Sequence, residues 1–247
     1  MITTFGRIAY EALEVCNGVE MATIAAAVAR TGLSQGAQAV DIGTGNAGVA
    51  LRLNQAFGLA VTAIEFDPVM AELAAVRIAA AGGGVDLVLG SAAEVLEQRP
   101  PFDLIVALGT TNLTGEGRPT PEAGFALLRR HARPGGWLLW GDLVWRGEPS
   151  EPLKQVVEAT NLYTDDKGWI AAAQGAGFAL EWREISSQTV FDTYARDAVG
   201  AARSWLEAHP DAPEADTVRF HADRMQAVFE FGQGLIGFGL YLFRAPN

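Results

Sequence analysis

Short apolar runs alternate with longer amphipathic stretches along most of the chain, a pattern that predicts strands separated by helices. Strand-length apolar runs occupy residues 39–42, 59–65, 85–89, 102–109, 137–145, 178–186 and 235–244. Helical spacing occupies 49–57, 68–81, 121–131 and 165–173 between them. Several of the runs are apolar at nearly every position, as expected of parallel strands buried on both faces. The pattern therefore predicts an α/β fold.

Helical segments are also expected before and after this alternation. Residues 7–30 predict two helices with a break near Asn17 and Gly18, and residues 188–234 predict two more, separated by 209–213. One stripe in the later segment recurs at spacings of 3, 4, 3 and 4, through Phe191, Tyr194, Ala198, Ala201 and Trp205. Such a stripe is typical of core packing. We predict a single domain: a helical segment (1–36), a core (37–187), a helical insert (188–233) and a final strand (234–247).

The stretch that carries most chemistry runs from Asp41 to Gly48, with glycines spaced GxGxxG between a strand and a helix. This layout is typical of a nucleotide-binding βαβ unit. In a dinucleotide site the turn faces a pyrophosphate, which the carboxylate of Asp41 would repel. An acidic strand end instead favours a ligand that carries an ammonium or sulfonium group.

Together with four further features in order, this turn resembles the class I S-adenosylmethionine (SAM)-dependent methyltransferases. Those features are Glu65 at the end of the second strand, Gly90-Ser91-Ala92, the strand at 102–109, and Pro134-Gly135-Gly136 before the fifth strand. The resemblance covers residues 38–186 and the last strand. It implies a Rossmann-like seven-stranded sheet with the last strand antiparallel, flanked by helices, with N-terminal helices and a helical insert before the last strand.

The resemblance implies that SAM is the cofactor and S-adenosylhomocysteine (SAH) the product. The expected cofactor-binding residues are Asp41, Gly43, Thr44, Gly45, Glu65, Phe66, Ser91, Ala92, Leu108 and Gly109. An acidic side chain at the position of Glu65 can accept the hydroxyls of a ribose. Ser91 stands where the family commonly has Asp, so a contact with the adenine amino group would lack charge assistance.

Methyl transfer by in-line displacement needs a positioned acceptor and a shaped site, and no covalent enzyme intermediate. Where the acceptor must lose a proton, a carboxylate or tyrosine can take it. We predict Asp142 and Tyr194 for this catalytic role. We predict Thr111, Asn112, Trp145 and Tyr194 as substrate-binding residues.

Composition narrows the range of partners. The 247 residues carry a net charge of −11, with 18 Lys and Arg against 29 Asp and Glu, and no basic patch is visible. Nucleic acid and anionic membranes are therefore not expected partners. No run approaches the length of a membrane span and no leader is apparent, so a cytoplasmic protein is expected, and a homodimer is left open.

Cysteine and histidine usage bears on metals. Cys16 is the single cysteine, which rules out an intramolecular disulfide and a cysteine-based zinc site. His131, His209 and His221 have no metal-ligand spacing. No bound metal is expected.

The sequence also contains or allows signals for activities other than methyl transfer. Residues 32–36 match GxSxG, but a helix precedes and a strand follows, the reverse of a nucleophile elbow. An NAD-linked oxidoreductase and a non-catalytic SAM-binding protein remain as alternatives. The sequence favours a SAM-dependent methyltransferase that acts on a small organic metabolite, neutral or cationic.

Overall fold

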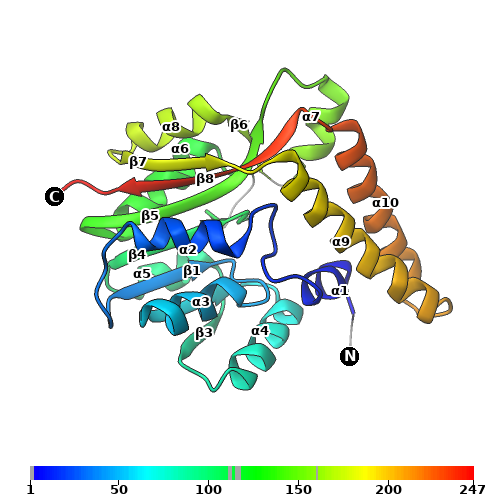
Figure 1. Ribbon diagram of the computed structural model, residues 1–247, viewed down its shortest axis with the longest axis horizontal. Coiled ribbons are helices and arrows are strands. Elements are labelled where there is room, and N and C mark those ends of the chain that lie inside the picture. Colours follow the sequence, from blue (N-terminus) through cyan, green and yellow to red (C-terminus); the bar gives the residue numbers. More distant parts are fainter. Residues whose placement is uncertain (1–2, 111–112, 115–117, 160) are drawn as a thin grey trace.

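The computed structural model describes residues 3–110, 113–114, 118–159 and 161–247, and every structural statement below refers to these residues. One mixed sheet forms the centre of the molecule, with helices on both faces (Figure 1). The strands are β1 (Gln38–Ile42), β2 (Ala60–Glu65), β3 (Val85–Leu89), β4 (Phe102–Leu108), β5 (Ala132–Trp145), β6 (Thr164–Asp165), β7 (Ala179–Ile185) and β8 (Ile236–Arg244).

The strand order is β3-β2-β1-β4-β5-β8-β7, with the two-residue β6 paired to β5. Strands β1 to β5 pair in parallel, whereas β8 is antiparallel to both β5 and β7. The chain therefore reverses its direction of winding between β1 and β4. In open α/β sheets, the crevice at such a switch point is where ligands bind.

The helices occupy two faces and one end of the sheet. Their bounds are α1 (Phe5–Glu11), α2 (Met21–Ala29), α3 (Gly48–Phe57), α4 (Pro68–Ala80), α5 (Ala92–Glu97), α6 (Pro121–His131), α7 (Glu151–Val157), α8 (Asp166–Gly175), α9 (Gln188–Ala208) and α10 (Ala215–Phe231). Helix α1 lies at one end of the sheet, beside α9, α10 and α4 (Figure 1).

Two apolar cores fill the two faces of the sheet. One core includes Ile24 of α2 and Leu53 of α3, and the other includes Phe125 of α6 and Trp169 of α8. Strand β5 contributes to both, because side chains alternate along a strand. Leu139 faces the first core, while its neighbours on either side, Leu138 and Trp140, face the second. Each core is buried, so both faces stabilise the sheet.

The expected Rossmann-like sheet with an antiparallel last strand is confirmed, together with the N-terminal helices and the helical insert. Local sequence signals place several helix ends correctly. Asp67 caps α4 through Val69 N–H with Pro68 at the first position, and Asp165 caps α8 through Gly168 N–H.

Some expectations on the elements are wrong. Helices α5 and α7 and the short β6 were not expected. The predicted turn at 133–136 lies within β5 as an irregularity, where the β4–β5 register shifts and Gly135 has a φ of +65°. The buried stripe of α9 also differs from the predicted one: it runs through Phe191, Ala195, Ala198, Ala202 and Leu206. Trp205 and Ala201 are only half-buried.

Candidate functional site

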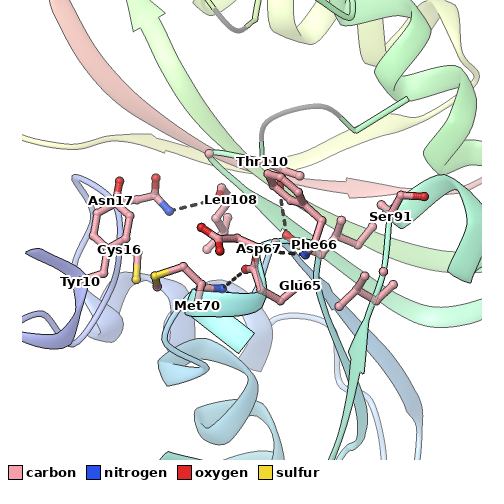
Figure 2. A pocket seen from close by; sticks show the side chains of 17 residues that line it. Tyr10, Cys16, Asn17, Glu65, Phe66, Asp67, Met70, Ser91, Leu108 and Thr110 are labelled. Carbon is pink, nitrogen blue, oxygen red and sulfur yellow. Dashed lines mark hydrogen bonds between the residues drawn. The ribbon is translucent and has the colours of Figure 1, made fainter. Parts of the chain in front are cut away.

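A cavity of about 250 Å³ lies at the switch point of the sheet, and we call it the switch-point cavity. The residues that line it are Tyr10, Cys16, Asn17, Ile42, Gly43, Gly45, Ile64, Glu65, Phe66, Asp67, Met70, Gly90, Ser91, Ala92, Leu108, Gly109 and Thr110. Figure 2 shows Tyr10 and Asn17 at one end, Ser91 at the other, and Glu65 and Asp67 between them. The cavity is therefore elongated, with chemically distinct ends.

The glycine turn after β1 lets the backbone form one wall of this cavity. Gly43 and Gly45 have φ angles of +68° and +56°, in the left-handed region that favours glycine. A Cβ on Gly45 would lie 3.1 Å from Cys16 Sγ, and one on Gly43 would lie 3.3 Å from Thr110 Oγ1. Both glycines thus allow close packing as well as the turn itself.

Asp41 lies behind the turn, outside the described lining of the cavity. Its carboxylate is 3% exposed and accepts a hydrogen bond of 2.7 Å from the hydroxyl of Thr44. Burial raises the pKa of Asp41 to about 6; the Thr44 hydrogen bond lowers this pKa, and the nearby carboxylate of Glu65 raises it. The structure therefore shows Asp41 and Thr44 bracing the turn from within.

Glu65 ends β2 inside the cavity and is 5% exposed. Its Oε2 accepts from Gly45 N–H at 2.8 Å, and its Oε1 accepts from Phe66 and Asp67 N–H at 3.0 Å each. Burial raises the pKa of Glu65, and these backbone hydrogen bonds oppose the rise. A carboxylate offers about four lone-pair sites, so Glu65 retains acceptor capacity towards the cavity.

The far end of the cavity is formed by the start of α5 and the residue after β2. Ser91 caps α5 by accepting from Glu94 N–H, and its hydroxyl donates to Glu94 Oε2 at 2.8 Å. Phe66 is 52% exposed although it is aromatic. This end thus presents an exposed ring face, the hydroxyl oxygen of Ser91 and the small side chain of Ala92.

Leu108 and Gly109, at the end of β4, close the cavity opposite the turn. Asn17 Nδ2 donates to the Leu108 carbonyl at 3.1 Å, and a Cβ on Gly109 would collide with Asn17 Oδ1. Thr110 follows, and its hydroxyl donates to the Ile42 carbonyl at 2.8 Å. Thr111 and Asn112, predicted to bind substrate, lie outside the described residues.

The N-terminal arm, residues 3–20, supplies lining residues that the sequence analysis did not find. Tyr10, Cys16 and Asn17 come from this arm, and Met70 comes from α4. Asn46, in the glycine turn and 1% exposed, donates at 2.8 Å to the carbonyl of Tyr10 and at 2.8 Å to that of Leu13. The arm is therefore fastened to the turn by a buried side chain.

Asp142 faces a second, smaller cavity of about 10 Å³, which borders the first through Thr110. It is 3% exposed and accepts from Leu143 N–H at 2.8 Å. Burial raises the pKa of Asp142 to about 7, which that hydrogen bond opposes. Trp140 Nε1 and Asn161 Oδ1 also border this space, and both are buried without a hydrogen-bond partner among the described residues.

Two other predicted residues also lie outside the described lining of the switch-point cavity. Trp145 packs in an apolar core, where its indole N–H donates to Glu158 Oε1 at 3.2 Å. Tyr194, on α9, packs its ring 6.0 Å from that of Phe229 and has the Tyr10 hydroxyl as a hydrogen-bond partner. Burial raises the pKa of Tyr194 well above its usual range. The structure brings eight of the ten predicted cofactor residues together in the lining of the switch-point cavity, with Asp41 and Thr44 behind the glycine turn. Asp142, Trp145 and Tyr194 are not part of this lining.

Metal sites and membrane-spanning helices are absent from the described residues. Within the described part of the chain, no group of three His, Cys, Asp or Glu side chains is arranged to hold a metal ion. Among the same residues, every helix is too short or too polar to span a membrane.

Comparisons with known proteins agree with this geometry. Residues 39–136 match the family model of the methyltransferase domain. No curated protein sequence matches the chain significantly. The methyltransferase family uses SAM, the donor expected from the sequence.

Solved structures resemble the chain over nearly its full length. A SAM-dependent methyltransferase from Thiobacillus denitrificans, in complex with SAH, has a TM-score of 0.83 at 22% identity, covering 99% of each chain. One from Geobacter sulfurreducens, also with SAH, has a TM-score of 0.81 at 22% identity, covering 100% of this chain and 99% of that one. YjhP from E. coli has a TM-score of 0.82 at 20% identity, covering 98% and 99%. The match over residues 39–136 and the fold shared with SAM-dependent methyltransferases confirm the predicted resemblance.

Proposed function

We propose that the protein transfers a methyl group from SAM to a small organic molecule. The observation that carries this proposal is the 2.8 Å hydrogen bond from Gly45 N–H to Glu65 Oε2. It joins the glycine turn and the acidic strand end, the two motifs of the resemblance, inside one cavity at the switch point. A lone GxGxxG pattern would be weak support, whereas the two motifs in one cavity form a nucleoside-shaped site.

The lining residues of the cavity support a SAM site with the adenine at one end and the methionine at the other. Glu65 is positioned to accept ribose hydroxyls with its remaining acceptor capacity. Phe66, Ser91 and Ala92 would hold the adenine, and Gly43, Gly45, Leu108 and Gly109 would lie along the rest of the donor. Asp41 and Thr44 would act from behind by fixing the turn, because their carboxylate and hydroxyl are already paired with each other.

The site does not suit a dinucleotide such as NAD, which binds to the same glycine pattern in the alternative function, an NAD-linked oxidoreductase. A pyrophosphate needs free backbone N–H groups at the turn and a nearby positive charge. None of the described lining residues is Lys, Arg or His, and Glu65 and Asp67 line the middle of the cavity. A cationic sulfonium donor is better matched to this charge.

The chain's part in the reaction is to hold both partners in line and to keep water away. The N-terminal arm covers one end of the cavity, so an acceptor would approach from the side of Thr110. Asp142 is proposed as the proton acceptor, because its cavity borders Thr110 and its pKa of about 7 suits that role near neutrality. A direct path from Asp142 to the acceptor would need the side chains around Thr110 to move.

The acceptor is proposed to be a small metabolite held by Thr111 and Asn112, because Trp145 packs in an apolar core and the Tyr194 hydroxyl is paired with Tyr10. Support comes from one structure with the same fold, a putative sarcosine dimethylglycine methyltransferase from Galdieria sulphuraria, with a TM-score of 0.72 at 16% identity, covering 91% of this chain and 84% of that one. Other proteins of this fold are a [4+2]-cyclase and a mycolic acid cyclopropane synthase, so the fold alone does not choose the acceptor. We propose a cytoplasmic enzyme, consistent with its acidic composition.

The test is incubation with SAM labelled in the methyl group and a panel of small amines, alcohols, thiols and carboxylic acids, followed by mass spectrometry. A labelled product that disappears with E65A, but not with E72A on the exposed face of α4, supports the proposal. Tight SAM binding without any product across the panel would favour a non-catalytic SAM-binding protein. No SAM binding at all would refute the donor assignment.

A further inference from the structure

We infer that the Tyr10 hydroxyl binds the carboxylate of the donor's methionine moiety, and that Tyr194 positions this hydroxyl. The inference rests on the proposed function, since it concerns how the same cavity holds SAM. The methionine end of SAM carries a carboxylate and an ammonium group, and a buried carboxylate needs hydrogen-bond donors or a cation. The question is which groups of this chain supply them.

A cation is not available from the lining. The described residues around the cavity include no Lys, Arg or His, and its acidic members are Glu65 and Asp67. Arg77, on α4, lies outside the lining and is committed elsewhere: its guanidinium donates to the carbonyls of Glu11 and Leu13. The carboxylate must therefore be held by neutral N–H or O–H donors.

The backbone of the glycine turn, the usual source of such donors, is already engaged. Five of the six N–H groups from residue 43 to residue 48 donate hydrogen bonds within the protein, and the sixth, that of Asn46, is directed at the Cys16 sulfur. The acceptors of the five are Ile64 O for Gly43 and Thr44, Glu65 Oε2 for Gly45, Thr44 O for Ala47 and Asn46 Oδ1 for Gly48. The turn is thus closed to an anion unless it loses an internal hydrogen bond.

Few side-chain donors remain at the end of the cavity opposite Ser91, where Tyr10 and Asn17 lie (Figure 2). Thr110 donates its hydroxyl hydrogen to the Ile42 carbonyl, and Asn17 directs an amide hydrogen to Leu108 O. Burial raises the pKa of Cys16 to about 12, so its thiol stays neutral and is only a weak donor. Tyr10 is the hydroxyl that remains at this end, beside the second amide hydrogen of Asn17.

Hydrogen bonds to neighbouring residues also orient Tyr10. Tyr10 and Tyr194 are hydrogen-bond partners through their hydroxyl groups. A hydroxyl can donate one hydrogen bond and also accept, so when Tyr194 donates to the Tyr10 oxygen, the Tyr10 hydrogen is left for a third group. On the backbone side, Asn46 holds the Tyr10 carbonyl. Helix α9 and the glycine turn therefore fix Tyr10 from two directions.

The test is isothermal titration of the purified protein with SAH and with decarboxylated SAH, which keeps the adenosine, the thioether and the amine but lacks the carboxylate. For the wild type, SAH should bind at least 10-fold more tightly, because a hydrogen bond to a charged group contributes on the order of 10-fold or more to affinity. Y10F should weaken SAH binding roughly 10-fold and leave the affinity for decarboxylated SAH within about two-fold. Y241F, at a buried tyrosine of β8 outside the cavity, is the matched control and should change neither affinity.

Y194F keeps the Tyr10 hydroxyl but frees its orientation, so it should reduce the preference for SAH by less than Y10F does. If Y10F does not fold, Y194F decides, and an unchanged preference overturns the inference. Equal weakening of both ligands in Y10F also overturns it, because the lost contact would not be to the carboxylate. SAH binding that is the same in wild type and Y10F overturns the inference and leaves the proposed function standing. Failure of the wild type to bind SAH overturns both.

Discussion

The buried amide of Asn46 donates a 2.8 Å hydrogen bond to the carbonyl of Tyr10, and so joins the glycine turn to the N-terminal arm. The residues in contact are 36 positions apart along the chain. Because Tyr10 lines the cavity, the arm is part of the site rather than an appendage to it.

The first prediction concerns this link. N46A removes three hydrogen bonds, to the carbonyls of Tyr10 and Leu13 and from Gly48 N–H, so the free energy of unfolding should fall by about 1–3 kcal/mol. SAH affinity should fall as well, because the arm loosens. The control is N54A, at the other end of α3, where the amide donates to Leu59 O at 3.0 Å. N54A should lower stability without changing SAH affinity, and equal affinity in N46A would contradict the link.

The second prediction concerns Glu65. E65Q keeps the shape of the side chain but replaces one carboxylate oxygen with an NH2 group. That group donates hydrogen bonds and cannot accept them, so the E65Q side chain could not accept from both the backbone N–H groups and the ribose hydroxyls. We expect SAH binding to weaken roughly 10-fold or more, as for loss of hydrogen bonds to a charged acceptor. Calorimetry against E72Q, an exposed glutamate on α4, provides the comparison. Unchanged binding by E65Q would remove Glu65 from the donor site.

The third prediction concerns Gly45. In G45A the new Cβ would lie 3.1 Å from Cys16 Sγ on a backbone with a φ of +56°. Both effects destabilise the turn, by about 1–2 kcal/mol together. In the double variant G45A/C16A the loss of stability due to the clash with Cys16 should disappear, while the loss due to the strained backbone should remain. Chemical denaturation measures both. A double variant no more stable than G45A would mean that Cys16 does not limit this position.

The fourth prediction concerns the pH dependence of stability. Burial raises the pKa of Asp142 from 3.8 to about 7. The native state then holds this proton to higher pH than the unfolded chain does, so the free energy of unfolding should decrease as pH rises from about 4 to 7. The slope from one such group approaches about 1.4 kcal/mol per pH unit.

Replacing the carboxyl tests this slope. D142N can keep the acceptor for Leu143 N–H but does not titrate, so its stability should depend less on pH across that window. D211N, in the exposed segment between α9 and α10, should retain the wild-type slope. Asp41, whose pKa is raised to about 6, also makes the free energy of unfolding decrease with rising pH, between about pH 4 and 6. Because Asp41 is present in both variants, this contribution is the same in each. An identical slope in D142N would show that Asp142 is not protonated in the native protein.

The sequence predicted the sheet and the glycine turn because both depend on local patterns. Apolar runs specify β1, β2 and β4, and the ends of adjacent parallel strands meet at one edge, so Gly43, Gly45 and Glu65 were expected together. Asp165 and Asp67 likewise mark helix starts by local capping. These features need no knowledge of how distant segments pack.

The lining residues from the N-terminal arm were not predictable in this way. Tyr10 and Asn17 reach the cavity only because the arm docks on Asn46 and Leu108, contacts that no local pattern encodes. The polar Cys16-Asn17-Gly18 segment was interpreted only as a helix break.

Because Asp142 lies towards the end of a strand, the sequence predicts a position near the mouth of the switch-point cavity. The direction of its side chain, however, decides which of the two cavities it faces. It has the same parity along β5 as Leu138 and Trp140, whose side chains face the core beneath α6 and α8. Alternation along the strand therefore turns Asp142 away from the glycine turn and towards the second cavity. Tyr194 differs from its predicted position for another reason. The buried stripe of α9 runs beside Tyr194, and the Tyr194 hydroxyl forms a hydrogen bond with Tyr10 instead of lining the cavity.

The measurement that tests the central claim most directly is calorimetric titration of the purified protein with SAM and SAH, with NAD as the comparison ligand. Micromolar binding of SAM and SAH with no binding of NAD is the predicted result. Binding of NAD, or of none of the three, would contradict the assignment of the switch-point cavity to a methyl donor.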